Sequence, residues 1–102
     1  MHKMIVGTEC KVLVMVEPID GVHMSGMEFS CLFYTDVSSP IEIKKDQMIK
    51  VDDDSYIALL DTSGFKPGTL RNRMIVDIPD HDFLDGFRRE IADMEIDAKI
   101  LQ

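Results

Sequence analysis

The sequence lacks most of the features that identify a chemistry. It has no Trp, two Cys, three His and only 7% aromatic residues, so core packing of the aromatic side chains is more expected than a sugar-stacking surface. Basic residues are scarce as well, with 11 Lys and Arg against 19 Asp and Glu and a net charge of −8. This balance argues against nucleic acid and against an anionic membrane surface, because both attract basic side chains.

Long hydrophobic runs are also missing. No run approaches the roughly 20 residues that span a bilayer, and Met4–Val6 is shorter than the apolar core of a signal peptide. The run Val12–Val16 has no cleavage site beside it and ends before Glu17-Pro18, so we interpret it as a strand. We therefore expect no export signal in the chain as given.

Cysteine and histidine give no sign of a metal centre. A domain of this length does not need a disulfide, and Cys31 lies in an alternating apolar series that is typical of a buried free thiol. We expect free cysteines, and pairing of Cys10 with Cys31 stays open. The spacing of the cysteines and of the three histidines matches no zinc site, and no cofactor is expected.

What the sequence does contain is a series of short strand-like segments separated by turn residues. Alternation over residues 27–34 places Met27, Phe29, Cys31 and Phe33 on one inward face. Strands are predicted at residues 11–17, 27–34, 41–44, 48–51, 56–60, 69–78 and 87–101. About seven short strands with turns between them are typical of an antiparallel β-sandwich. We predict an all-β fold in one domain over residues 1–102.

Three details of this prediction concern individual segments. In the strand at 69–78 the inward side chains are expected to be Leu70, Met74, Val76 and Ile78, with Asn72 interrupting them. Five methionines that lie among apolar residues are expected to pack in the core: Met4, Met15, Met27, Met48 and Met74. The segment 87–101 fits a helical stripe as well as a strand, and the all-β context favours the strand.

The segment Tyr56–Leu70 resembles the corner of immunoglobulin-like domains, where a loop places one apolar residue in the core before a tight turn starts the next strand. On this resemblance Phe65 is the core residue. Gly68 supplies a backbone conformation that residues with a Cβ adopt poorly. Leu70 stands where many such domains have Tyr. The resemblance makes the predicted sandwich an immunoglobulin-like one.

A more specific resemblance covers about residues 24–102. It rests on the stretch Ile78–Glu90, which is the most distinctive, and on segments 27–29, 33–36, 43–45, 51–52, 56–59 and 68–70. In these residues the chain is similar to small proteins and N-terminal domains of Bacteroidales phages and prophages, which share the general form of the immunoglobulin-like domains of phage baseplate and tail-fibre proteins. In those relatives Pro is more usual at the position of Leu84, and Thr at that of Arg89. The resemblance implies an architectural or docking module with no catalytic residues.

The acidic residues of Ile78–Glu90 come close to the spacing of a calcium-binding EF-hand loop but do not match it. Counted from Asp80, the third Asp and Gly86 each fall one position late for an EF-hand loop. A different Ca²⁺ loop built from Asp80, Asp82 and Asp85 is the weaker alternative. The favoured interpretation is a turn whose carboxylates accept local backbone N–H groups, with Arg88 and Arg89 neutralising the acids.

Two other groups of residues have both a structural and a functional interpretation. Asp52–Asp54 is expected to be a solvated hairpin tip, with weak cation binding as the alternative. Phe83 and Phe87 are the best candidates for a protein-binding patch, and anchoring of the loop to its own sandwich is equally compatible with the sequence. No Gly-x-Ser-x-Gly elbow or P-loop is present, so an enzyme is not expected.

The function that follows is a non-enzymatic structural or assembly module of a phage or prophage particle, cytoplasmic before any particle assembly. The expected partners are proteins, including a second copy of the chain, and exclude nucleic acid and membrane. The alternative is a small module that binds Ca²⁺ or a glycan. The candidate interaction residues are Asp80, Asp82, Phe83, Asp85, Phe87 and Arg88.

Overall fold

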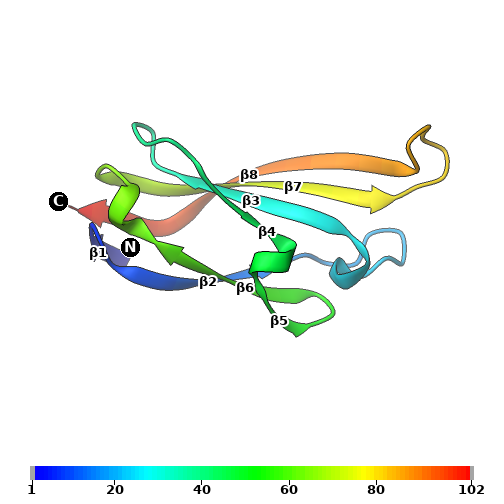
Figure 1. Ribbon diagram of the computed structural model, residues 1–102, viewed down its shortest axis with the longest axis horizontal. Helices are drawn as coiled ribbons and strands as arrows, with labels where there is room; N and C mark the ends of the chain where they lie inside the picture. The colour runs from blue at the N-terminus through cyan, green and yellow to red at the C-terminus, as the bar shows by residue number, and fades with distance from the viewer. Residues whose placement is uncertain (1, 102) are drawn as a thin grey trace.

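The chain folds into two β-sheets that face each other (Figure 1). The computed structural model describes residues 2–101, with side chains for residues 3–93, 100 and 101. The larger sheet has the strand order β1-β8-β7-β3-β4, and the smaller has the order β2-β6-β5. The strands are β1 (His2–Ile5), β2 (Glu9–Met15), β3 (Glu28–Tyr34), β4 (Ile41–Lys44), β5 (Ile49–Asp52), β6 (Ser55–Asp61), β7 (Gly68–Pro79) and β8 (Phe87–Leu101).

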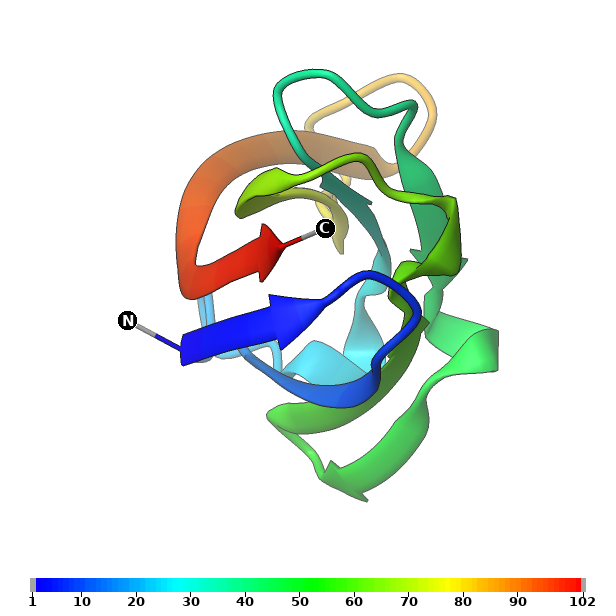
Figure 2. The same cartoon turned by 90° about the vertical axis from the view of Figure 1, so that its left-hand side faces the viewer.

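The predicted all-β class is confirmed, with eight strands where about seven were predicted, but the purely antiparallel arrangement is wrong. An eighth strand, β1, pairs with the end of β8 in parallel, from His2 opposite Ala98 to Ile5 opposite Leu101. Figure 2 shows these two strands side by side. The larger sheet is therefore mixed. The sequence could not show this pairing, because β1 has only four residues and its partner lies at the other end of the chain.

A single apolar cluster lies between the sheets, and period-two alternation determines which side chains enter it. Phe29, Cys31 and Phe33 of β3 are buried, as predicted. The predicted inward set of β7 is buried as well, together with Asn72. Cys10 and Cys31 are free thiols. The other buried apolar residues are Met4, Val14, Met24, Met27, Ile43, Tyr56, Ala58, Leu60, Phe65 and Ile100.

The methionine prediction fails at one position. Met4, Met27 and Met74 are buried and Met48 packs against the core, but Met15 is 65% exposed. Val14 is the inward residue at this end of β2, and alternation turns its neighbour Met15 to the opposite face. A continuous apolar run therefore concealed which residues of β2 face solvent.

The segment before β7 turns tightly and contributes one apolar side chain to the core. Phe65 is buried in the core, directly after the 3₁₀ turn η3 (Thr62–Gly64). Gly68 starts β7 with a φ of +153°, which residues with a Cβ rarely adopt. Leu70 is buried at the next inward position.

Residues 87–101 form a strand, as favoured over the helix. β8 pairs with β7 from Phe87 opposite Pro79 to Ile100 opposite Gly68, with one irregularity near Thr69. The β7–β8 hairpin runs along the long axis of a molecule measuring 47 × 26 × 22 Å and places its loop at one end (Figure 1). The helical segments among the described residues are three-residue 3₁₀ turns, and none has the length or apolarity of a membrane-crossing helix.

Candidate interaction site

The loop that joins β7 to β8 contains four of the six predicted interaction residues, and the other two, Phe87 and Arg88, begin β8. The backbone of the loop is closed by its own hydrogen bonds. The Asp80 N–H donates to the Gly86 carbonyl at 2.8 Å, across the mouth of the loop. Inside it, the Gly86 N–H donates to the Phe83 carbonyl at 2.9 Å, and the Phe83 N–H donates to the Asp80 carbonyl at 3.3 Å. Because these bonds link successive positions, the loop has a defined shape without a ligand.

The carboxylates of this loop bond to its backbone, in agreement with the turn interpretation. Asp80 Oδ1 accepts the Asp82 N–H at 3.1 Å, and Asp85 Oδ1 accepts the Phe87 N–H at 3.1 Å. Within residues 2–101, no three or more His, Cys, Asp or Glu side chains of those described lie together in a way that could hold a metal ion. The weaker alternative, a Ca²⁺ site at Asp80, Asp82 and Asp85, gains no support from this geometry.

Arg88 connects the loop to a second one. Its Nη1 lies 3.0 Å from Asp80 Oδ2, and its Nη2 lies 3.0 Å from Asp20 Oδ2. The hydrogen bond to Asp20 is the main cause that raises the pKa of the Arg88 guanidinium. Neutralisation of the acidic loop by Arg88 was predicted, whereas the contact with Asp20, 68 positions away, could not be read from the sequence.

The Asp20 carboxylate is itself held by a tight turn between β2 and β3. Ile19 and Val22 form an isolated β-bridge, and the two residues between them, Asp20 and Gly21, have φ of 51° and 78°. Positive φ at both central positions is the pattern of a type I′ turn, for which Asp-Gly is a preferred sequence. The β2–β3 and β7–β8 loops are therefore fixed to each other at one end of the sandwich (Figure 1).

Three apolar side chains are exposed to solvent here, two in the β7–β8 loop and one at the start of β8. Leu84 is fully exposed, Phe83 is 48% exposed and Phe87 is 42% exposed. Neither phenylalanine belongs to the core or to the partly buried residues packed against it, which disfavours their use as anchors of the loop. We call Phe83, Leu84 and Phe87 the loop tip. It presents apolar surface on a backbone that is already ordered.

The second acidic cluster forms the predicted hairpin tip, with Asp52 and Asp53 exposed to solvent. Asp52 ends β5, and Asp53 and Asp54 form the turn before β6. Side chains of this turn also bond to the segment before β3. Asp54 accepts the Met24 N–H at 3.0 Å and lies 3.0 Å from His23 Nδ1. The Met24 hydrogen bond, followed by the one with His23, holds the pKa of Asp54 below its ordinary value. Asp53 pairs with Lys50 at 3.1 Å and accepts from the Ser25 hydroxyl at 3.2 Å.

Sequence reasoning missed the apolar outer face of the smaller sheet. Leu13 lies opposite Ile57, and Ile57 lies opposite Ile49. Leu13 is 57% exposed and Ile49 is 51% exposed, and Leu59 lies beside them on the same face of β6. The available signal was the continuous apolar character of 12–16 and 57–60, since strands covered on both faces read as unbroken apolar runs.

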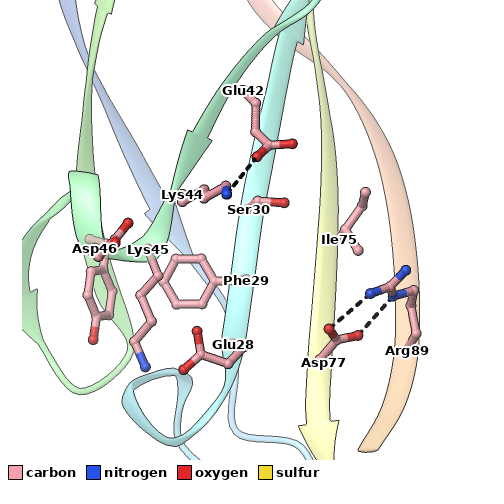
Figure 3. A pocket seen from close by; sticks show the side chains of 11 residues that line it. Glu28, Phe29, Ser30, Glu42, Lys44, Lys45, Asp46, Ile75, Asp77 and Arg89 are labelled. Carbon is pink, nitrogen blue, oxygen red and sulfur yellow. Dashed lines mark hydrogen bonds and ion pairs between the residues drawn. The ribbon is translucent and has the colours of Figure 1, made fainter.

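A depression lies beside β3, and three cations line it, Lys44, Lys45 and Arg89 (Figure 3). Lys45 Nζ donates to the carbonyls of Ser25 at 2.8 Å and Met27 at 2.7 Å, and lies 5.7 Å from the centre of the Phe29 ring. Arg89 forms two hydrogen bonds with Asp77, at 2.9 and 3.1 Å. Lys45 and Arg89 therefore already donate hydrogen bonds to groups of the protein.

Comparisons with protein-family models, with curated proteins and with solved structures found no significant match.

Proposed function

We propose that this protein is a non-enzymatic docking module of a phage or prophage particle, and that it binds a protein subunit of that particle through the loop tip. One observation carries the proposal, namely that Phe83, Leu84 and Phe87 are exposed on a closed loop. Aromatic side chains, including Phe, are enriched in protein interfaces. The backbone of the loop is ordered beforehand, so binding loses less conformational entropy.

The order of the strands supports the immunoglobulin-like part of this proposal. In variable-type domains one sheet holds strands G, F, C and C′, and the other holds B, E and D. In chain order, β8, β7, β3 and β4 take the first set of places, and β2, β6 and β5 take the second. β1 departs from the scheme of constant-type domains, because it pairs with β8 and not with the smaller sheet.

This correspondence also gives the loop tip a familiar position. In variable domains the B–C and F–G loops lie at the end that recognises other molecules. Here the β2–β3 and β7–β8 loops take these places, and the contact between Asp20 and Arg88 joins them. The proposed binding surface thus has the rigid scaffold that binding loops require.

Site-specific photocrosslinking tests the proposal in cells that produce the particle. A photoreactive amino acid at position 84 is expected to form an adduct with one particle subunit, identified by mass spectrometry. Phe83→Ser in the same chain is expected to abolish that adduct. A matched probe at the exposed residue Lys66, in the loop before β7, reports non-specific capture. Purified particles that lack the chain, or equal adducts from positions 84 and 66, would contradict the proposal.

A further inference from the structure

One edge of β8 has no partner over most of its length. β7 pairs along one side of β8, whereas on the other side β1 covers only Ala98–Leu101. Among the described residues, no backbone hydrogen bond from a loop reaches Phe87–Asp97 along that edge. An open strand edge presents unpaired N–H and C=O groups, which another strand can use.

The outward side chains along this edge follow a self-complementary order. Arg89, Ile91 and Asp93 lie on one face of β8, opposite Asp77, Ile75 and Arg73 of β7. Arg89 forms a two-bond fork with Asp77, and Arg73 forms one with Asp93, both bonds of the latter at 2.8 Å. Ile91 between them is 60% exposed. Along β8 this face carries a positive, an apolar and a negative side chain in turn. Two copies of it that run antiparallel would therefore place opposite charges against each other.

We propose that β8 of a second copy pairs antiparallel with this edge, about a two-fold axis at Ile91. In this register Arg89 lies opposite Asp93 of the second copy, and the two Ile91 side chains meet at the axis. The rows of charge then continue across the junction, from Asp77 and Arg89 to Asp93 and Arg73 of the second copy. Opposite charges and apolar pairs that face each other stabilise antiparallel strands.

The charges select this register over its neighbours. Directly opposite residues of antiparallel strands lie on the same face of a sheet. A two-fold axis perpendicular to the joined sheet therefore places one residue of β8 opposite the same residue of the second copy. An axis at Glu90 or at Asp93 would place like charges opposite each other. An axis at Ala92 would place Ile91 against Asp93. Of these registers, the axis at Ile91 alone pairs opposite charges and apolar side chains on the outward face. It also sets Glu90 opposite Ala92 on the other face.

The length of the free edge fits the pairing. In this register Phe87 lies opposite position 95 of the second copy, which is short of Ala98, where β1 takes over the edge. The two larger sheets would join into one continuous sheet through β8. The inference goes beyond the docking function proposed above, because it concerns the β8 edge and a second copy of the chain instead of the loop tip and a particle subunit.

Sedimentation equilibrium of the full chain tests the inference. We expect the 11.6 kDa chain to form a dimer. Ile91→Lys is expected to raise the dissociation constant of this dimer by about tenfold or more, because two ammonium groups would meet at the axis. The matched control is Leu59→Lys, since Leu59 is 54% exposed on the other sheet. Circular dichroism checks that both variants keep the strand signal.

A second variant detects the register directly. In a Cys10→Ser background, Ile91→Cys is expected to form an intermolecular disulfide under mild oxidation, whereas Ile5→Cys, equally exposed at 57%, is not. A chain that stays monomeric up to about 1 mM, or a dimer that Leu59→Lys disrupts and Ile91→Lys does not, overturns the inference. Adduct formation at position 84 does not need this edge, so failure of one proposal is distinguishable from failure of the other.

Discussion

Replacing Gly68 by Ala is expected to destabilise the fold through both the backbone and a side-chain contact. The φ of +153° at Gly68 costs a residue with a Cβ about 1–3 kcal/mol. The new Cβ would also lie 3.3 Å from Thr35 Cβ. Thr35 cannot easily move away, because it is buried and its hydroxyl donates to the Lys66 carbonyl at 3.0 Å. We therefore expect a loss in the upper part of that range.

Urea and thermal unfolding measure this effect. For a domain of this size, a loss of about 2–3 kcal/mol lowers the melting temperature by roughly 8–20 °C. The matched control is Gly64→Ala in the same corner, where φ is not positive and the nearest atom, Ile41 Cδ1, is 4.0 Å from the new Cβ. That substitution is expected to change stability by less than about 1 kcal/mol. Equal losses in the two variants would refute the reasoning.

Three further predictions concern buried polar and titratable groups. Thr62→Val is expected to cost about 1–2 kcal/mol in urea unfolding, because the buried hydroxyl accepts from the β1–β2 turn at 3.1 Å and donates to it at 2.9 Å; an unchanged midpoint would contradict this. Asp54 raises the pKa of His23, so protonated His23 stabilises the fold. This contribution is fully present below about pH 6.5 and is lost as the pH rises through the raised pKa of the folded state. The pKa of Asp54 is lowered, so its contribution is present above about pH 4 and is lost as the pH falls through the lowered folded value. Asp54→Asn should flatten both limbs of the stability curve, and an unaltered curve would count against the pair. Burial raises the pKa of Cys31 to about 11, so a thiol reagent should label Cys10 in the folded protein and Cys31 only after unfolding; equal rates would exclude the buried thiol.

Local patterns predicted most of the core. Alternation identified Phe29, Cys31 and Phe33 as inward residues of β3, and each is buried. It worked because a half-buried strand encodes its inner face in every second residue. The same reasoning failed for Met15, where both faces of β2 are apolar and the period-two signal disappears. The choice between helix and strand at 87–101 depended on the rest of the fold, because this segment becomes a strand by pairing with β7.

The candidate site was predictable in its position but only partly in its contacts. The short spacing between Asp80 and Gly86 predicted a turn with local carboxylate bonds, and two such bonds are present. The partner of Arg88 on the β2–β3 loop and the docking of Asp54 against His23 were not predictable. Both contacts join residues far apart in sequence, and any of the many exposed carboxylates was an equally good partner on composition alone.

The sequence by itself determined seven of the eight strands, most of the side chains that face inward and where the turns fall. These properties depend on interactions between residues only a few positions apart. The tertiary structure alone decided that β1 pairs in parallel with β8, that the outer face of the smaller sheet is left uncovered, and that β8 keeps a free edge. Such outcomes depend on how many strands compete for each edge and face. That competition is resolved only when the whole chain has packed.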